Sequence, residues 1–210
     1  MEIKTTTWEE HGETFEKVAL GVKKYVDEKG LQVDAIVPIF RGAGFLATYL
    51  AYRLSVLRIL PVQYKYFFPK KGTAELHQLL FTPSKEILGD SPTLVLVEGD
   101  YCYGGTTTQA CKDLKEEFPN CKIIFATDLA DYTYRDVVKD YVETMVVGRY
   151  TNHCEELSEE ECEKLGIQSI SRAVWEQASE EEAIPKCEQY QYIDLEKVKS
   201  KSKKKFEMEF

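Results

Sequence analysis

The chain has 210 residues, of which 43% are hydrophobic and 30% charged, an ordinary composition for one globular domain with a full core. The net charge of −9 disfavours a nucleic-acid-binding surface, because nucleic acids attract basic proteins. No run of about 18 apolar residues occurs, so no membrane span is expected. Residues 1–10 lack the apolar stretch of a signal peptide, and we expect a cytoplasmic protein.

The cysteines lack the spacing of a metal centre. None form a C-x-x-C pair, and no pair of histidines accompanies them. We therefore expect no zinc site and reduced thiols, as in most cytosolic proteins. The six cysteines are Cys102, Cys111, Cys121, Cys154, Cys162 and Cys187.

The first predicted element is an amphipathic helix over residues 7–29. Thr7 and Glu10 fit a capping box, in which each side chain bonds the other residue's backbone N–H. Apolar residues recur on one face of this segment, and Gly30 ends it.

A short apolar run predicts a strand over 34–39, followed by the turn Arg-Gly-Ala-Gly at 41–44 and a helix over 45–57. Another strand is expected over 59–66. The long polar stretch 67–92 then predicts an irregular lid or binding loop, because connections of this length inside a compact domain are usually functional.

The second half begins with a continuous apolar run at 93–97, typical of a strand buried on both faces. A helix is expected after it, through residue 117. Further elements are predicted as a strand over 123–126, a helix over 134–139 and a strand over 141–147. This alternation predicts an α/β fold with a parallel sheet, and ligands then bind at the carboxyl ends of its strands.

Beyond residue 150 the pattern weakens. Ser158 with Glu161 predicts a short capped helix that ends at Gly166. Residues 177–189 are acidic and typical of a loop.

The C-terminal segment carries six lysines after Glu196. A nucleic-acid patch is one interpretation, but the segment lacks interleaved aromatic residues and the rest of the chain is acidic. We therefore predict one domain over 1–195, with a hood from 64–92 and from the part after 150, and a flexible tail over 196–210.

The strand-to-loop segment 94–108 carries the most chemical information. A buried strand runs into Glu98 and Asp100, and Gly-Gly-Thr-Thr-Thr at 104–108 opens a helix. The first N–H groups of a helix are unpaired and lie at the positive end of its dipole, glycines allow close approach, and Thr hydroxyls add donors. The segment therefore predicts a phosphate-binding loop. A plain strand-to-helix turn with Thr caps stays open as the alternative.

The same segment resembles the phosphoribosyl-pyrophosphate signature of type I phosphoribosyltransferases: an apolar strand, acidic residues, four variable positions and Gly-Gly-Thr. Residues 35–42 resemble the pyrophosphate loop of that family, in which a strand runs into Arg-Gly-Gly. The pattern is most similar to the bacterial xanthine-guanine and archaeal hypoxanthine-guanine subgroup. In all, the resemblance covers about residues 7–176, with weaker matches at 7–10, at 124–127 and at 174–176, which includes Trp175.

The resemblance implies a type I phosphoribosyltransferase fold and a role for each residue that matches the family motifs. Glu98 and Asp100 would hold the ribose hydroxyls, directly or through Mg²⁺, and Cys102 stands where purine enzymes have an Asp base. Arg41 and Gly42, with the neighbouring amides through residue 44, would receive pyrophosphate, and Tyr150 would stack on the base. The residues expected to hold the 5-phosphate are Tyr103, Gly104, Gly105, Thr106, Thr107 and Thr108.

Four departures from the family pattern fall on ligand-contacting positions. Gly99 replaces the second acidic residue, Cys102 the Asp base, Thr127 a purine-contacting Lys, and Ala43 a glycine of the Arg-Gly-Gly turn. Together they argue against a standard 6-oxopurine enzyme.

Two function classes therefore stay open. One is a phosphoribosyltransferase that acts on an atypical, purine-like nitrogenous base. The other is a non-catalytic regulator or scaffold that binds phosphoribosyl pyrophosphate or a nucleoside 5-monophosphate. A homodimer is expected from the resemblance alone.

Overall fold

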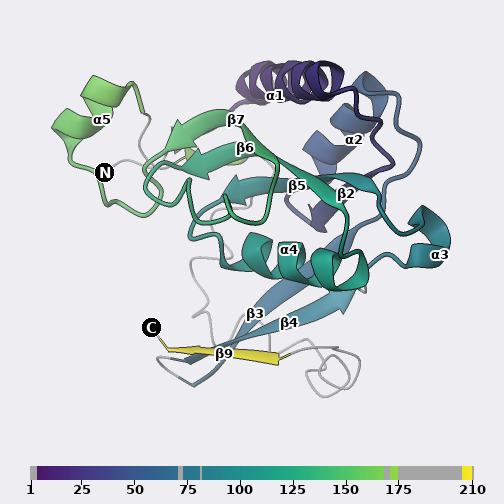
Figure 1. The fold of residues 1–210 in the computed structure, drawn as a ribbon. Helices are drawn as coiled ribbons and strands as arrows, with labels where there is room; N and C mark the ends of the chain where they lie inside the picture. The colour runs from purple at the N-terminus through teal and green to yellow at the C-terminus, as the bar shows by residue number, and fades with distance from the viewer. Residues whose placement is uncertain (1–3, 71–72, 81, 168–170, 175–204, 210) are drawn as a thin grey trace.

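A computed structural model describes residues 4–70, 73–80, 82–167, 171–174 and 205–209. A seven-stranded sheet with the order β7-β6-β5-β2-β3-β4-β9 forms its centre (Figure 1). The first five strands of this order run parallel to one another, β4 is antiparallel to β3, and β9 is antiparallel to β4. The strands are β2 (Ala35–Phe40), β3 (Val62–Lys70), β4 (Thr73–Leu80), β5 (Thr93–Tyr101), β6 (Lys122–Asp131), β7 (Thr144–Thr151) and β9 (Lys205–Glu209).

The strand order places a topological switch point between β2 and β5. From β2 the chain adds β3 on one side, and then returns to place β5, β6 and β7 on the other side. Connections that leave neighbouring strands in opposite directions open a crevice at the carboxyl ends of those strands, where ligands of open α/β sheets bind. The predicted α/β fold with a parallel sheet is therefore confirmed.

Helices cover both faces of the parallel strands. Helices α1 (Trp8–Lys29) and α2 (Gly44–Arg53) pack on one face, and α4 (Gly105–Glu117) on the other (Figure 1). The expected capping box at Thr7 and the left-handed end of α1 at Gly30, with φ 59°, are both present.

The side chains on the two faces of β5 belong to two separate hydrophobic cores. Leu94 and Leu96 pack with Leu114 of α4, while Val95 and Val97 pack with Val18 of α1 and its neighbours. This side-chain alternation along a strand buried on both faces explains why the segment reads as a continuous apolar run.

A buried polar contact fixes α1 to the sheet. His11 Nδ1 lies 2.5 Å from Asp128 Oδ2 on β6, and the Thr14 hydroxyl donates to the same carboxylate. Because buried polar groups are costly unless they are paired, this contact sets the position of α1 along the strand.

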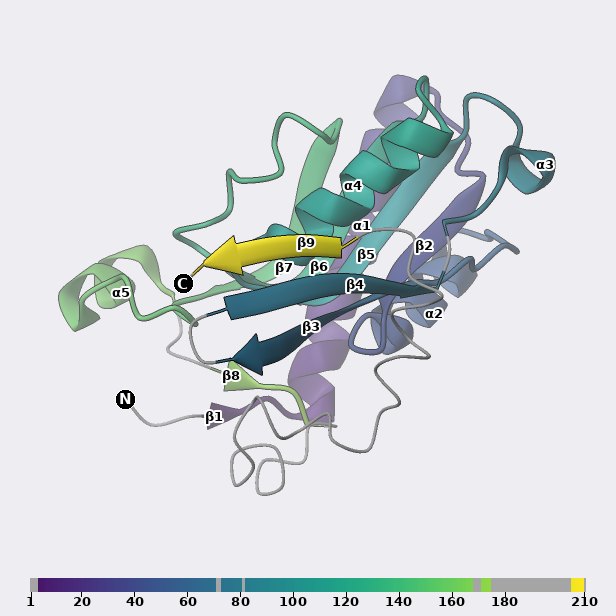
Figure 2. The ribbon, with the colours of Figure 1, turned by 90° about the horizontal axis from the view of Figure 1, so that it is seen from below.

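The long polar stretch 67–92 is not an irregular loop, so that prediction was wrong. It contains the end of β3, all of β4 and the short helix α3 (Lys85–Leu88), and β3 and β4 form an antiparallel hairpin beside α4 (Figure 2). Its polar residues are buried because they find partners: Gln78 donates to the hydroxyls of Tyr64 at 3.3 Å and of Thr82 at 3.0 Å, and Nε2 of His77 lies 3.0 Å from the carboxylate of Glu75.

Residues 134–139 form consecutive turns and not the predicted helix. Asp131 accepts from the N–H of Thr133 at 2.9 Å, and the N–H groups of Val137 and Lys139 bond carbonyls three residues earlier. The i to i−3 bonds close separate turns in place of the continuous i to i−4 bonds of an α-helix.

The chain end also differs from the sequence-based expectation. Residues 205–209 of the expected flexible tail form β9, which pairs with β4 and covers that edge of the sheet (Figure 2). The predicted short helix is confirmed as α5 (Glu159–Leu165), with its capping box and its end at Gly166. A small parallel pair, β1 (Lys4–Thr5) and β8 (Ser171–Arg172), completes the fold. Trp175 and the segment 177–189 lie outside the described residues.

Among the described residues, no helix is both long and apolar enough to cross a membrane.

Candidate functional site

The site lies at the carboxyl ends of β2 and β5, where the turn after β2 packs directly against β5. A Cβ atom added at Gly99 would lie 2.7 Å from the carbonyl oxygen of Gly42 and 2.8 Å from its carbon. Real Cβ atoms do not approach backbone this closely, so only glycine allows the contact. The close packing gives a physical reason for Gly99 at a position where the resembled family has an acidic residue.

The loop after β5 is fixed by a glycine at its corner. Gly104 has φ 75°, in the left-handed region, and precedes the first residue of α4. A Cβ there would lie 2.6 Å from the hydroxyl of Tyr101, which is buried and donates to the carbonyl of Tyr134 at 3.0 Å. Residues 102–104 thus bring the chain to the N-terminus of α4, whose first N–H groups have no acceptor within the helix. This geometry suits a phosphate.

Strand β3 brings Tyr66 to the same loop. A Cβ added at Gly105 would lie 2.5 Å from the Tyr66 hydroxyl, so the ring tip rests on the first residue of α4. Burial raises the pKa of Tyr66, while a hydrogen bond with Thr106 acts in the opposite direction. The hydroxyl therefore stays protonated and available as a donor beside the phosphate-binding loop.

Glu98 is half-buried at the end of β5 and accepts a hydrogen bond from the Thr107 hydroxyl. Burial, and secondarily the charge of Asp100, raise the pKa of Glu98 to about 8. A nearby cation or hydroxyl donor stabilises the ionised form of such a buried carboxyl group. Thr107 itself is buried, so its side chain serves Glu98.

Asp100 lies on β5 and contacts the turn that follows β7. Its Oδ2 is 3.5 Å from Nδ1 of His153, and the residue is half-buried. The structure thus brings Glu98 and Asp100 close enough for the charge of Asp100 to act on Glu98. Carboxylate oxygens are the ligands that Mg²⁺ prefers, and it retains waters and substrate oxygens elsewhere in its shell, so this pair fits the ion.

The turn after β2 leaves fewer donors than the resemblance implied. Arg41 and Gly42 are exposed, but the N–H of Ala43 bonds the carbonyl of Ile39 at 3.4 Å, and that of Gly44 bonds the carbonyl of Arg41 at 3.0 Å. The expectation that the amides through residue 44 receive pyrophosphate is therefore corrected to Arg41 and Gly42.

The two residues at the positions of purine-specific groups offer no substitute for them. Thr127 is fully buried, and its hydroxyl donates to the carbonyl of Leu129 at 2.7 Å. Burial and the charge of Asp100 raise the pKa of Cys102 far above its ordinary range, so its thiol stays neutral and is a poor general base.

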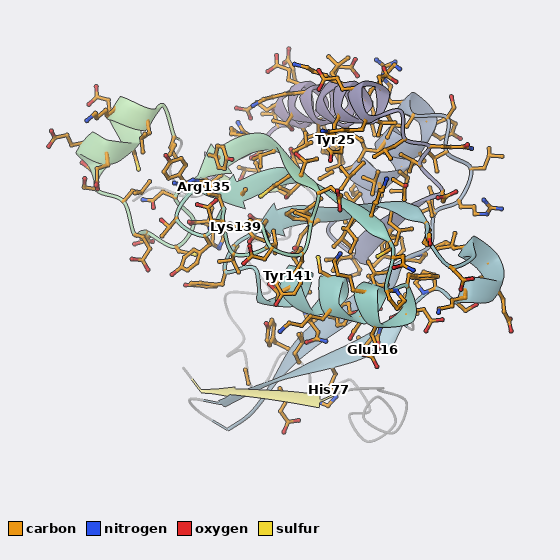
Figure 3. All side chains as sticks on the ribbon, in the orientation of Figure 1. Tyr25, His77, Glu116, Arg135, Lys139 and Tyr141 are labelled. Carbon is orange, nitrogen blue, oxygen red and sulfur yellow. The ribbon has the colours of Figure 1, made fainter. Side chains whose placement is uncertain are left out.

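The two aromatic candidates, Tyr103 and Tyr150, each pack against another tyrosine. Tyr103 is exposed and packs edge-on against Tyr134, with ring centroids 4.9 Å apart. Tyr150 packs edge-on against Tyr132 at 5.4 Å and lines a cavity of about 370 Å³. Figure 3 labels Arg135 and Lys139, which come from the turns beside β7 and line the same cavity.

Sequence reasoning missed Tyr66 and His153. Tyr66 comes from a segment predicted to lead into a lid, and only the hairpin places its hydroxyl on α4. His153 follows β7 by two residues, so its place after a predicted strand was the available signal.

Comparisons with known proteins bear on the fold alone. No protein-family model matches the sequence, and no curated protein sequence matches it. A purine phosphoribosyltransferase from Pyrococcus horikoshii is similar in structure, with a TM-score of 0.60 and 17% identity over 84% of this chain and 95% of the other. A hypothetical protein from Neisseria gonorrhoeae with bound ppGpp has a TM-score of 0.61 and 15% identity over 87% and 94%.

A hypoxanthine-guanine phosphoribosyltransferase from Bacillus anthracis, with a TM-score of 0.50 and 16% identity, covers 71% of this chain and 85% of its own. These similarities, together with the switch point and the strand-loop-helix unit after β5, define the architecture. The chain has the fold of the type I phosphoribosyltransferases.

Proposed function

We propose that the protein binds phosphoribosyl pyrophosphate or a nucleoside 5-monophosphate at residues 103–108, and transfers the phosphoribosyl group to a nitrogenous, purine-like base. The observation that carries this proposal is the N-terminus of α4, which opens beside Glu98 at the switch point of the sheet. A helix N-terminus supplies oriented N–H donors for a phosphate, and a carboxylate next to it can bind ribose hydroxyls.

In this proposal each group orients the ligand or stabilises charge. The N–H groups of 105–107 and the hydroxyls of Thr106 and Tyr66 hold the 5-phosphate, because the N–H of Thr108 already bonds the carbonyl of Gly104 at 2.8 Å. Glu98 accepts from the ribose hydroxyls, and Arg41 donates to the departing pyrophosphate. Such preorganised donors lower the barrier by stabilising charge that develops as the glycosidic bond changes partners.

Mg²⁺ belongs to the proposal through Glu98 and Asp100, which offer carboxylate oxygens to it. When bound, the ion would neutralise negative charge on the pyrophosphate. The chain's own contribution is to hold the two carboxylates near one another at the end of β5.

A non-catalytic nucleotide-binding protein is the second candidate function. The absence of a purine-binding Lys at Thr127, which is buried, and the neutral thiol of Cys102 favour it. The fold relative from Neisseria gonorrhoeae with bound ppGpp is an example of a guanosine nucleotide bound to a protein of similar architecture.

Ligand binding at the loop is expected to raise the melting temperature. At a hundredfold excess over the dissociation constant, phosphoribosyl pyrophosphate with Mg²⁺ or a nucleoside 5-monophosphate should add about 2.7 kcal/mol to the free energy of unfolding. Gly105→Val should remove this gain, because its Cβ position is 2.5 Å from the Tyr66 hydroxyl and its methyls would enter the loop. Differential scanning fluorimetry measures both effects, and an unchanged melting temperature with every ligand at millimolar concentration would refute the binding site.

Turnover is expected to be weak or absent with hypoxanthine, guanine and xanthine. Loss of a general base typically costs about 10²–10⁴ in rate, and the chain has Cys102 and Thr127 where that base and the purine-binding Lys are expected. Labelled phosphoribosyl pyrophosphate incubated with a panel of nitrogenous bases separates the two candidate functions by the release of pyrophosphate. Release with any base supports the enzyme, and binding without release from the whole panel supports the non-catalytic protein.

A further inference from the structure

Three different metal-binding side chains meet beside the phosphate-binding loop. One ligand atom each from Asp100, Cys102 and His153 lies within 4.8 Å of the other two, and all three residues are half-buried. Asp100 is the penultimate residue of β5, Cys102 opens the loop after that strand, and His153 follows β7. A carboxylate, a thiol and an imidazole together form a mixed ligand set, which differs from an ordinary exposed acidic cluster.

Their spacing is close to that of a tetrahedral centre. Zinc bonds of about 2.0–2.3 Å place neighbouring ligand atoms about 3.3–3.7 Å apart. Nδ1 of His153 is 3.5 Å from Oδ2 of Asp100, which already falls in this range. The Sγ of Cys102 lies within 4.8 Å of both of these atoms.

The turn that carries His153 is fixed from two sides. The N–H of Cys154 donates to Asp131 at the end of β6 at 2.7 Å. The side chain of Asn152 donates to the carbonyl of Leu157 at 2.9 Å and accepts from the N–H of Leu157 at 3.0 Å. These bonds fix the turn that carries His153 without a cation, so little ordering of its backbone is needed when one binds.

We propose that Asp100, Cys102 and His153 bind zinc or a similar divalent transition metal, with the fourth tetrahedral position open to water or to a ligand. Thiolate and imidazole ligands select such a metal over Mg²⁺, which takes oxygen ligands. Cysteine spacing predicts no zinc site because the ligands come from the ends of two strands that are distant in sequence. The site shares Asp100 with the proposed Mg²⁺ position, but Cys102 and His153 belong to it alone, and it joins the loop after β5 to the turn after β7.

Titration of the metal-free, reduced protein with Co²⁺ tests this site, because tetrahedral Co²⁺ has intense visible absorption and thiolate ligation adds a charge-transfer band. We expect saturation at one equivalent in the micromolar range, competition by Zn²⁺, and no competition by millimolar Mg²⁺. Cys102→Ser should remove the charge-transfer band, and His153→Gln should weaken binding more than about tenfold. The matched control Cys162→Ser, on α5, should bind like the wild type.

Circular dichroism establishes that each variant is folded, and His153→Gln carries the test if Cys102→Ser does not fold. A wild-type protein that shows no saturable Co²⁺ binding would overturn the proposal, as would a charge-transfer band that survives in Cys102→Ser or binding that is unchanged in His153→Gln. Nucleotide binding measured on His153→Gln keeps the two proposals apart: loss of Co²⁺ binding with retained nucleotide binding supports a separate metal site.

Discussion

Gly99→Val is expected to lower the free energy of unfolding by about 3 kcal/mol and to abolish nucleotide binding. The new Cβ would lie 2.7 Å from the carbonyl oxygen of Gly42 and 2.8 Å from its carbon. Because these are backbone atoms, the turn after β2 must move away from β5, and Arg41 moves with it. Urea unfolding measures the stability, and fluorimetry with a nucleoside 5-monophosphate measures the binding.

Gly12→Ala is the matched control. Gly12 lies in α1 with nothing within 4 Å of its Cβ position, so the variant should gain about 0.5–1 kcal/mol from helix propensity and bind nucleotide normally. A Gly99→Val protein as stable as the wild type would contradict the close packing of the turn on β5, and with it the physical reason for glycine at this position.

The local chemistry of the segment 94–108 was sufficient to predict its structure. A strand made only of apolar residues must be buried on both of its faces. The sequence Gly-Gly-Thr-Thr-Thr combines a left-handed turn at Gly104 with hydrogen-bond donors at the start of a helix. The same reasoning predicted the capped ends of α1 and α5. In each case the decisive interactions lie within a few residues of one another.

Elements that depend on distant partners were not predictable in this way. The alternation in β4 is hidden because Glu75, His77 and Gln78 are buried polar residues, and their burial depends on partners that only the folded chain provides. β9 forms only because the edge of β4 offers unpaired backbone groups to it. A polar sequence reads as a loop unless those partners are known.

The candidate site shows the same division. Glu98, Asp100 and Gly104 follow from one strand and its loop, and in the structure Asp100 lies near Glu98 while Gly104 precedes the first residue of α4. Tyr66 and His153 reach the loop from β3 and from the turn after β7, two parts of the chain with no sequence pattern that links them to it. From the sequence, Gly99 indicated the loss of an acidic residue of the family motif. The structure shows that there is no room for a side chain at this position.

The protonation of Glu98 leads to the second large effect. Its pKa of about 8 in the folded protein exceeds the ordinary value of 4.5, so the folded state binds the proton more tightly than the unfolded chain. Stability without ligand should therefore fall as the pH rises from about 4.5 to about 8, because ionisation costs more in the folded state. Glu98→Gln, which keeps an acceptor for Thr107, should remove this loss and be more stable than the wild type at pH 9, by an amount on the order of 2–4 kcal/mol.

Urea unfolding at several pH values between 4 and 9 measures this difference, with the exposed Glu86→Gln as a control that should follow the wild type. If Glu98 instead ionises at its ordinary pKa, the wild type and Glu98→Gln will keep a constant difference in stability across this range, which would contradict the burial of its carboxyl group.

The same variant should lose what the wild type gains from Mg²⁺. A cation that binds beside Glu98 offsets the cost of its ionisation, so Mg²⁺ should strengthen phosphoribosyl pyrophosphate binding in the wild type and less so in Glu98→Gln. The variant Asp100→Asn tests whether Asp100 also contributes to this enhancement by Mg²⁺. Titration calorimetry with and without Mg²⁺ measures the enhancement in each variant. If Asp100→Asn weakens the enhancement, both carboxylates serve the ribose and the ion. If it leaves the enhancement intact but lowers stability, Asp100 serves the contact with His153, and the single remaining carboxylate favours the non-catalytic nucleotide-binding protein.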